Sequence, residues 1–288
     1  MRAKISRLGI GFTLAALTLA AGEQSQEADS QVMIAAISRA ALVGGLGPSA
    51  LSKPGTVNVE PLAFLTSSGN WRSIPCKPGN GEGCKEFERE YLRKRHTYTV
   101  ISADGMGTTI HALPVTLTEC FGYNGDGTYS GGRIRNSAIA ASSADFFDNA
   151  DAPNRVSPSQ ASAIRKSLRP LVPKRLDSTE DLRLMTLQLE GMDLLVVQRA
   201  YGDNIDPTNF TRKYIFMIGR FDQGQFHVLH RKNNMEDEEE RVLGTIRMKN
   251  GREFLITTVA DPESQFFRIY GIRDGKLVVV FSGGGSSC

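Results

Sequence analysis

The sequence lacks the short motifs that mark the commonest catalytic and nucleotide-binding sites. It contains no G-x-x-x-x-G-K-[ST] loop for phosphates, no complete G-x-G-x-x-G, no H-E-x-x-H zinc motif, no G-x-S-x-G elbow and no S-x-x-K pair. These absences weigh against the common hydrolases and nucleotide enzymes. A site assembled from residues far apart in the chain stays open.

An excess of positive charge is also missing once the N-terminus is set aside. The whole chain has 34 Lys and Arg residues against 31 Asp and Glu residues. Arg2, Lys4 and Arg7 supply three of these cations, so residues 22–288 carry no net charge. A neutral protein has no long-range positive field to attract phosphate backbones, and nucleic acid is therefore not an expected partner.

The longest apolar run lies at the N-terminus and is too short to span a bilayer. Three basic residues precede the run from Leu8 to Leu19, and Ala20, Ala21 and Gly22 follow it. A basic start, a short apolar core and small residues after it are typical of a cleaved signal peptide. We therefore expect residues 1–21 to be removed, the mature protein to be periplasmic or extracellular, and no stable membrane span to remain. A retained membrane anchor is the alternative.

Cysteine is scarce, with four in the chain: Cys76, Cys84, Cys120 and Cys288. In an oxidising compartment they can pair in three ways. We favour Cys76 with Cys84, because turn-forming residues fill positions 77–83, and by elimination Cys120 would then pair with Cys288. Free thiols and a metal site are the alternatives. Cys-x7-Cys is not a recognised zinc spacing and no Cys has a His within four residues, so we expect neither a metal nor a cofactor.

The order of patterns predicts a mainly β (α+β) protein of antiparallel sheets with about three short helices. Residues 22–50 should form an N-terminal tether with a helix over Val32–Val43, where apolar residues recur at helical spacing before two glycines. Residues 51–150 read as a β-rich domain that contains a second, amphipathic helix at Lys85–Arg95. Residues 151–288 should hold the third helix and two blade-like β repeats.

The third helix has a clear beginning and end in the sequence. Ser157 is the expected N-cap, Pro158 takes the first helical position, and Gln160 completes a capping box. The helix should end near Leu168, because two prolines follow.

The C-terminal part contains an internal repeat. Segment 191–197 matches 251–257, and 214–229 matches 266–281, so each copy reads as strand, strand, tight turn, strand. The repeat resembles the blade unit of FG-GAP or VCBS-type repeat proteins, which are exported or extracellular. The similarity covers roughly residues 182–283, and it implies blade-like antiparallel sheets.

In that family, alternating carboxylates before the glycine bind calcium. The places one, three and five before the two glycines are here Glu190, Gln188 and Thr186, and Asn250, Met248 and Ile246. A hard cation needs about six oxygen ligands, several of them anionic. Because most of these ligands are absent, this sequence departs from the family's calcium pattern.

The most unusual local composition lies at residues 120–132, where glycines surround two tyrosines and an aspartate. It predicts a tight hairpin, because Asn124-Gly125 and Asp126-Gly127 are both type I′ turn pairs. The alternative is a loop that offers backbone N–H groups and aromatic rings to a ligand such as a sugar. The candidate ligand-binding residues are Tyr123, Asp126, Tyr129 and His111.

Two other polar features have structural explanations. His227 and His230 lie three apart on a predicted strand, so their side chains point to opposite faces and cannot easily share a metal. The acidic run 236–240 should be a solvated loop, because five like charges repel one another and resist burial. Docking of a basic partner is the alternative.

Three functions fit these observations. The first is an exported, soluble, non-enzymatic binding or interaction protein of the cell envelope, with a protein or glycan as partner. The second is a secreted or periplasmic hydrolase whose site combines His111 with Asp104 or Asp126. The third is a structural envelope component with no small ligand.

Overall fold

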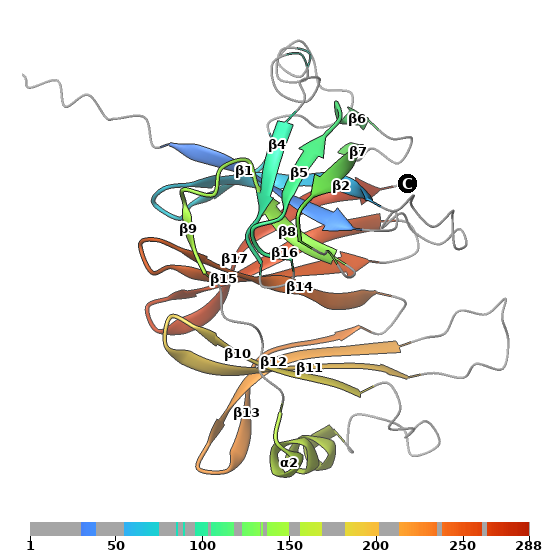
Figure 1. The fold of residues 1–288 in the computed structure, drawn as a ribbon. Coiled ribbons are helices and arrows are strands. Elements are labelled where there is room, and N and C mark those ends of the chain that lie inside the picture. Colours follow the sequence, from blue (N-terminus) through green and yellow to red (C-terminus); the bar gives the residue numbers. More distant parts are fainter. Residues whose placement is uncertain are drawn as a thin grey trace, which may run out of the picture.

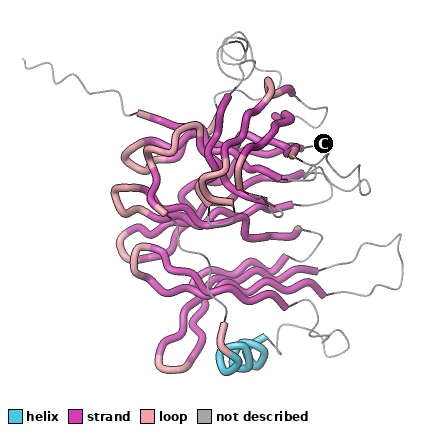
Figure 2. The backbone as a smooth tube through the Cα atoms, viewed as in Figure 1, coloured by secondary structure: helices cyan, strands magenta, loops and turns pink. Residues whose placement is uncertain are grey.

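The computed structural model describes residues 30–38, 55–74, 85, 89, 96–102, 105–117, 123–132, 134, 137–149, 156–168, 182–201, 213–234, 238–260 and 264–287. The described residues form three antiparallel sheets stacked on one another, with a helix at one end of the stack (Figures 1 and 2). The predicted mainly β, antiparallel fold class is confirmed. Several predictions fall outside the described residues: the signal peptide, Cys76, Cys84, Cys120, Cys288, Asp104 and most of Lys85–Arg95.

The first sheet closes on itself. Its pairings run β1–β8–β4–β5–β7–β2, and β2 pairs again with β1, so six of the described strands form a ring. The strands are β1 (Gln31–Ser38), β2 (Thr56–Thr66), β4 (His96–Val100), β5 (Thr109–Ala112), β7 (Tyr123–Ser130) and β8 (Ser137–Ala141), with the short β3 (Trp71–Arg72) and β6 (Thr116–Leu117) paired to β2 and β7. Buried apolar side chains, among them Met33, Val59, Tyr98 and Ile110, fill the inside of the ring.

Strand β1 corrects the helix predicted over Val32–Val43. Residues 32–38 are all buried, and alternate side chains enter different cores. Those facing outward are Val32, Ile34 and Ala36, and those facing the inside of the ring are Met33, Ala35 and Ile37. A strand buried on both faces reads as one unbroken apolar run, which periodicity alone does not distinguish from a buried helix. This part of the predicted tether is therefore a central strand of the ring.

Strand β7 corrects the hairpin predicted at residues 120–132. Tyr123–Ser130 forms one continuous strand, so neither Asn-Gly nor Asp-Gly makes a turn. The glycines serve close packing instead. A Cβ on Gly127 would lie 3.1 Å from methyl groups of both Ile110 and Val59, and a Cβ on Gly125 would lie 3.2 Å from the Cα of Val115. Glycine inside a strand can mark such a close approach as well as a turn.

The two predicted repeats fold as four-stranded meanders. The outer sheet contains β10 (Leu182–Leu189), β11 (Met192–Tyr201), β12 (Lys213–Asp222) and β13 (Gln225–Asn234) in that order. The middle sheet contains β14 (Glu239–Met248), β15 (Glu253–Ala260), β16 (Ser264–Arg273) and β17 (Lys276–Ser287), with β9 (Phe147–Asp148) added beside β14. Tight turns with both central residues at positive φ, as type I′ requires, join β10 to β11, β12 to β13 and β16 to β17.

Three apolar cores hold the layers together. One face of the middle sheet packs on the ring through residues such as Phe254 and Ile256. Its other face packs on the outer sheet, where Leu255 meets Phe216. The outer sheet is covered in turn by α2 (Pro158–Leu168), whose Ile164 and Leu168 are fully buried.

The sequence prediction for α2 is confirmed in detail. The N–H of Gln160 donates to Ser157 Oγ at 3.3 Å, and the N–H of Ser157 donates to Gln160 Oε1 at 3.0 Å, which together form the predicted capping box. In the described part of the chain, no helix has the length and apolar character needed to cross a membrane.

A buried carboxyl group lies where the ring meets the end of the middle sheet. Glu60 of β2 is buried and accepts a hydrogen bond from Gln265 Nε2 of β16 at 3.3 Å. The adjoining part of β17 fits there because it carries glycine. A Cβ on Gly284 would lie 2.7 Å from the carbonyl oxygen of Leu62, and a Cβ on Gly285 would lie 1.9 Å from that of Gln265.

The packing inside the ring predicts the effect of adding methyl groups at Gly127. Because neighbouring methyl groups already lie 3.1 Å from the Cβ position, we expect Gly127→Val to lower the free energy of unfolding by about 1–3 kcal/mol. Thr128→Val, at the next residue on the exposed face, should change it by less than about 0.5 kcal/mol. Urea denaturation followed by circular dichroism measures both. Equal stability of the two variants would contradict close packing at Gly127.

Glu60 predicts a pH dependence of stability. Burial raises the pKa of Glu60 to about 7, from an ordinary value of 4.5. Between these pH values the unfolded chain loses the proton and the native state keeps it. The stabilisation is therefore complete below pH 4.5 and is lost as the pH rises to about 7, a loss of about 3 kcal/mol.

The variant Glu60→Gln removes this titration and leaves an acceptor for Gln265. It should be more stable than the wild type at pH 8, and the difference should disappear near pH 4.5. Asp126→Asn makes the same charge change on the exposed face and should follow the wild-type profile. Urea denaturation between pH 4.5 and pH 8 measures the free energy of unfolding of all three proteins. If Glu60→Gln and the wild type change in parallel with pH, Glu60 is not the titrating group.

Candidate functional site

The structure separates the four ligand-binding residues predicted from the sequence into two pairs. His111 of β5 lies directly opposite Thr128 of β7 on the exposed face of the ring, and Asp126 lies two residues earlier on that same face. Tyr129 lies opposite Ile110 and packs against the core inside the ring, and Tyr123 is buried. The predicted site is therefore not assembled on one surface.

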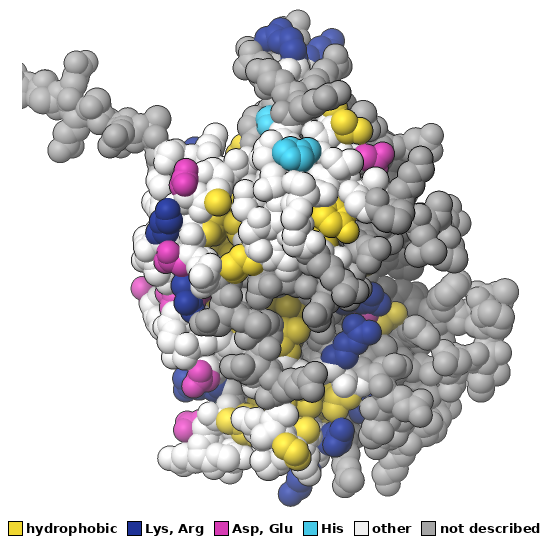
Figure 3. Space-filling model, in the orientation of Figure 1, with side chains coloured by type: hydrophobic (Ala, Val, Ile, Leu, Met, Phe, Trp, Pro, Cys, Tyr) yellow, Lys and Arg dark blue, Asp and Glu magenta, His cyan; other side chains and the backbone are white. Residues whose placement is uncertain are grey.

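The exposed pair lies on an open strand face and lines no described pocket. The ring part of the face in Figure 3 shows mainly backbone and uncharged polar side chains, with histidine and some apolar side chains among them. A general base and its partner act best where water is excluded, and exposed charges are screened by solvent and salt. With the tyrosines turned inward, this face also lacks the aromatic platform that was expected for a sugar.

A pocket of about 390 Å³ lies elsewhere, between the β12–β13 hairpin of the outer sheet and the β16–β17 hairpin of the middle sheet. It is lined by Met192, Arg220, Val228, Leu229, Gly275, Lys276 and Leu277. Four of these side chains are apolar and two are cationic. Both hairpins end in edge strands of the described sheets, β13 and β17.

A β-bulge lies in the wall of this pocket. His230 pairs with Ile218 and Val228 pairs with Gly219, so Leu229 is an extra residue in β13. Such a bulge bends the strand and increases its twist. A Cβ on Gly219 would lie 2.4 Å from the carbonyl oxygen of His227, so the bend requires glycine there.

Beyond the bulge, the tip of the β12–β13 hairpin bends away from the middle sheet. Phe221 and Phe226 near the tip pack against the core beneath α2. Figure 1 shows β13 running away from the middle sheet toward this helix. The β16–β17 hairpin of the middle sheet does not bend in that direction. The pocket is the space between the two hairpins.

The pocket exposes apolar side chains that a folded protein ordinarily covers. Val228 is 46% exposed and Leu229 is 40% exposed. Val279, two residues beyond the pocket residue Leu277 on β17, is 42% exposed. Contiguous exposed apolar residues beside a concavity are typical of a binding site.

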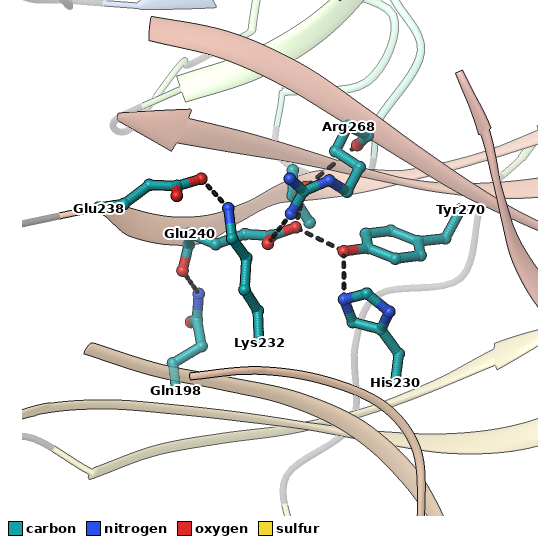
Figure 4. A network of polar contacts seen from close by, with 8 residues as sticks. Gln198, His230, Lys232, Glu238, Glu240, Arg268 and Tyr270 are labelled. Atoms are coloured by element: carbon teal, nitrogen blue, oxygen red, sulfur yellow. Dashed lines mark hydrogen bonds and ion pairs between the residues drawn. The ribbon is translucent and has the colours of Figure 1, made fainter. Parts of the chain in front are cut away.

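A polar network with a buried centre joins the same two sheets beside the pocket residue Leu229 (Figure 4). Its centre is Glu240 of β14, whose side chain is fully buried. Oε1 of Glu240 accepts hydrogen bonds from Thr257 Oγ1 and from the Tyr270 hydroxyl, each at 2.7 Å. Oε2 accepts a hydrogen bond from the guanidinium of Arg268 in an ion pair.

The outer sheet contributes the other half of the network. Gln198 Nε2 donates to the carbonyl oxygen of Glu240 at 3.0 Å, and Nε2 of His230 lies 3.1 Å from the hydroxyl of Tyr270. At the solvent side, Lys232 forms an ion pair with Glu238. His230 directly follows the pocket residue Leu229, so β13 lines both the pocket and the network.

Burial fixes the protonation states at the centre of the network. Burial, reinforced by the carboxylate of Glu240, raises the pKa of Tyr270. Burial lowers the pKa of His230 and outweighs the opposite effect of Glu240. Both rings are therefore neutral at neutral pH, and the carboxylate of Glu240 is matched by the guanidinium of Arg268.

This network is suited to joining the sheets and not to attacking a substrate. Both oxygens of Glu240 already accept hydrogen bonds, and its side chain is inaccessible to solvent. A buried charge whose hydrogen bonds are all made is stabilising, whereas one that loses its partner is costly.

The sequence prediction for the acidic run 236–240 is corrected at its last two residues. Glu239 and Glu240 belong to β14, and Glu240 is buried because Arg268 and Tyr270 compensate it. The sequence held one sign of this burial. Arg268 and Tyr270 lie two apart on a predicted strand, so their side chains share a face. For the pocket, the signal was Gly219 inside an apolar strand, which suggests a bulge.

The network predicts a large effect from a change of one atom. Glu240→Gln leaves Arg268 buried without a counter-charge, and we expect the free energy of unfolding to fall by about 3–5 kcal/mol. The adjacent Glu239 pairs with the exposed Arg241, so Glu239→Gln should cost at most about 1 kcal/mol. Urea denaturation at pH 7 measures both, and equal losses would contradict a central role for Glu240.

No protein-family model, curated protein or solved structure matches this chain. The resemblance of residues 182–283 to FG-GAP or VCBS repeats stays a prediction. Function is therefore argued from the chemistry of the pocket itself.

Proposed function

We propose that the protein is an exported, non-enzymatic binding protein of the cell envelope, and that the pocket between the two hairpins is its binding surface. The observation that carries the proposal is the exposure of Val228 and Leu229 beside a concavity of about 390 Å³. The signal-like N-terminus supports export, and the resemblance to exported repeat proteins supports it further.

The residues of the pocket favour binding over catalysis. Its described lining contains no carboxylate, histidine, cysteine or hydroxyl group that could act as a nucleophile or a general base. His230, which follows the pocket residue Leu229, is hydrogen-bonded to Tyr270 within the network. His111 and Asp126, the residues of the hydrolase hypothesis, lie on the ring and away from this pocket.

The residues that line the pocket also indicate what kind of chemical group it binds. Apolar side chains from both sheets surround the space, so the bound group should be apolar. A glycan would need hydroxyl-binding and stacking groups, but Tyr129 packs against the core inside the ring and Tyr123 is buried. A ligand or partner with an apolar segment therefore fits better than a glycan.

The uncharged fluorescent probe N-phenyl-1-naphthylamine tests the proposal. The mature protein should bind one probe molecule with increased fluorescence. Leu229→Asn should weaken binding about tenfold, because it replaces an apolar wall of the pocket by an amide.

Leu113→Asn is the matched control. Leu113 is 46% exposed but lies on the ring, so its replacement should leave probe affinity unchanged. Failure of the wild type to bind the probe, or equal binding by both variants, would contradict the proposal and favour a structural envelope component.

A further inference from the structure

We infer that the natural ligand of the pocket is a single-chain anionic amphiphile, such as a free fatty acid, with its carboxylate between Arg220 and Lys276. The inference rests on the proposed function and adds the chemical class of the ligand. It depends on the charges at the pocket and on the direction of its apolar wall.

The two cations come from opposite walls of the pocket. Arg220 belongs to β12 in the outer sheet, and Lys276 is the first residue of β17 in the middle sheet. Both are exposed, and neither forms an ion pair with any described residue. The nearest carboxylates along the chain, Asp222 and Asp274, do not line the pocket.

Two cations without counter-charges beside an apolar space select an acid group. A guanidinium binds a carboxylate through two parallel hydrogen bonds, and an ammonium adds a point charge. An amphiphile with a cationic head would be repelled by the same two residues. An uncharged one would leave them without a partner.

The apolar wall offers a path for a chain. Met192 and Leu277 line the pocket and also pack against the core between the two sheets. Leu277 pairs with Ile272, and Val279 pairs with Tyr270, so both β17 side chains lie on the face toward the outer sheet. A chain that starts in the pocket can therefore run along Leu277 toward the exposed Val279.

The size and the position of the pocket favour a free molecule over a membrane surface. A volume of about 390 Å³ lies in the range of small-ligand sites, and its lining residues come from two sheets. A membrane surface needs a broad cationic face, but the mature chain has no net charge.

Displacement of bound N-phenyl-1-naphthylamine tests the inference. The competitors are laurate, dodecyltrimethylammonium and dodecyl maltoside, each below its micellar concentration. Laurate should displace the probe at about tenfold lower concentration than either of the others. Arg220→Gln/Lys276→Gln should raise the laurate concentration needed for displacement about tenfold, to that of dodecyl maltoside.

Arg183→Gln/Lys249→Gln is the matched control. It removes the same charge from two exposed positions outside the pocket and should leave laurate binding unchanged. Equal displacement by the three competitors, or an equal effect of both double variants, would overturn the inference while the proposed function stands. Loss of probe binding by the wild type would instead overturn the proposed function.

Vesicles separate the two sources of an anionic chain. Vesicles of phosphatidylglycerol, compared with phosphatidylcholine, should not sediment the protein. Sedimentation that requires Arg220 and Lys276, without displacement of the probe by laurate, would overturn the inference in favour of a membrane surface.

Discussion

Burial of both faces of the middle sheet organises the whole molecule. Along β15, Phe254 and Ile256 pack toward the ring, and Leu255 between them packs toward the outer sheet. An apolar sheet of this kind is stable only when both of its sides are covered. The ring covers one side and the outer sheet covers the other. The far face of the outer sheet is apolar too, and α2 covers it.

Apolar burial has no direction, so it does not by itself align two stacked sheets. The network around Glu240 supplies that alignment. Its carboxylate, Arg268 and Tyr270 belong to the middle sheet, whereas Gln198 and His230 belong to the outer sheet. Because a buried polar group must meet its partners at hydrogen-bond distance, only one relative position of the sheets satisfies all five groups.

The sequence predicted those features that depend on neighbouring residues. The capping box of α2 and the strands of the two repeats are of this kind, since a few adjacent residues determine each. The predictions for β1 and β7 were wrong because the deciding contacts are distant in the chain. Strand β1 is buried by two cores, and Gly127 is used to approach Val59 and Ile110. The pocket combines a bulged hairpin of the outer sheet with a hairpin of the middle sheet, and no local pattern describes how these combine.

The place of β1 in the ring has a consequence for the time course of folding. Residues 31–38 are made early, yet β8 pairs with them from about a hundred positions later. Their outward side chains join a core completed by Phe267 and Ile269, near the end of the chain. Contacts this distant in sequence form slowly, so the outward face of β1 is fully covered only after nearly the whole polypeptide has been synthesised. For the export that we propose, such a delay would leave the chain unfolded at the stage when a translocation channel must accept it.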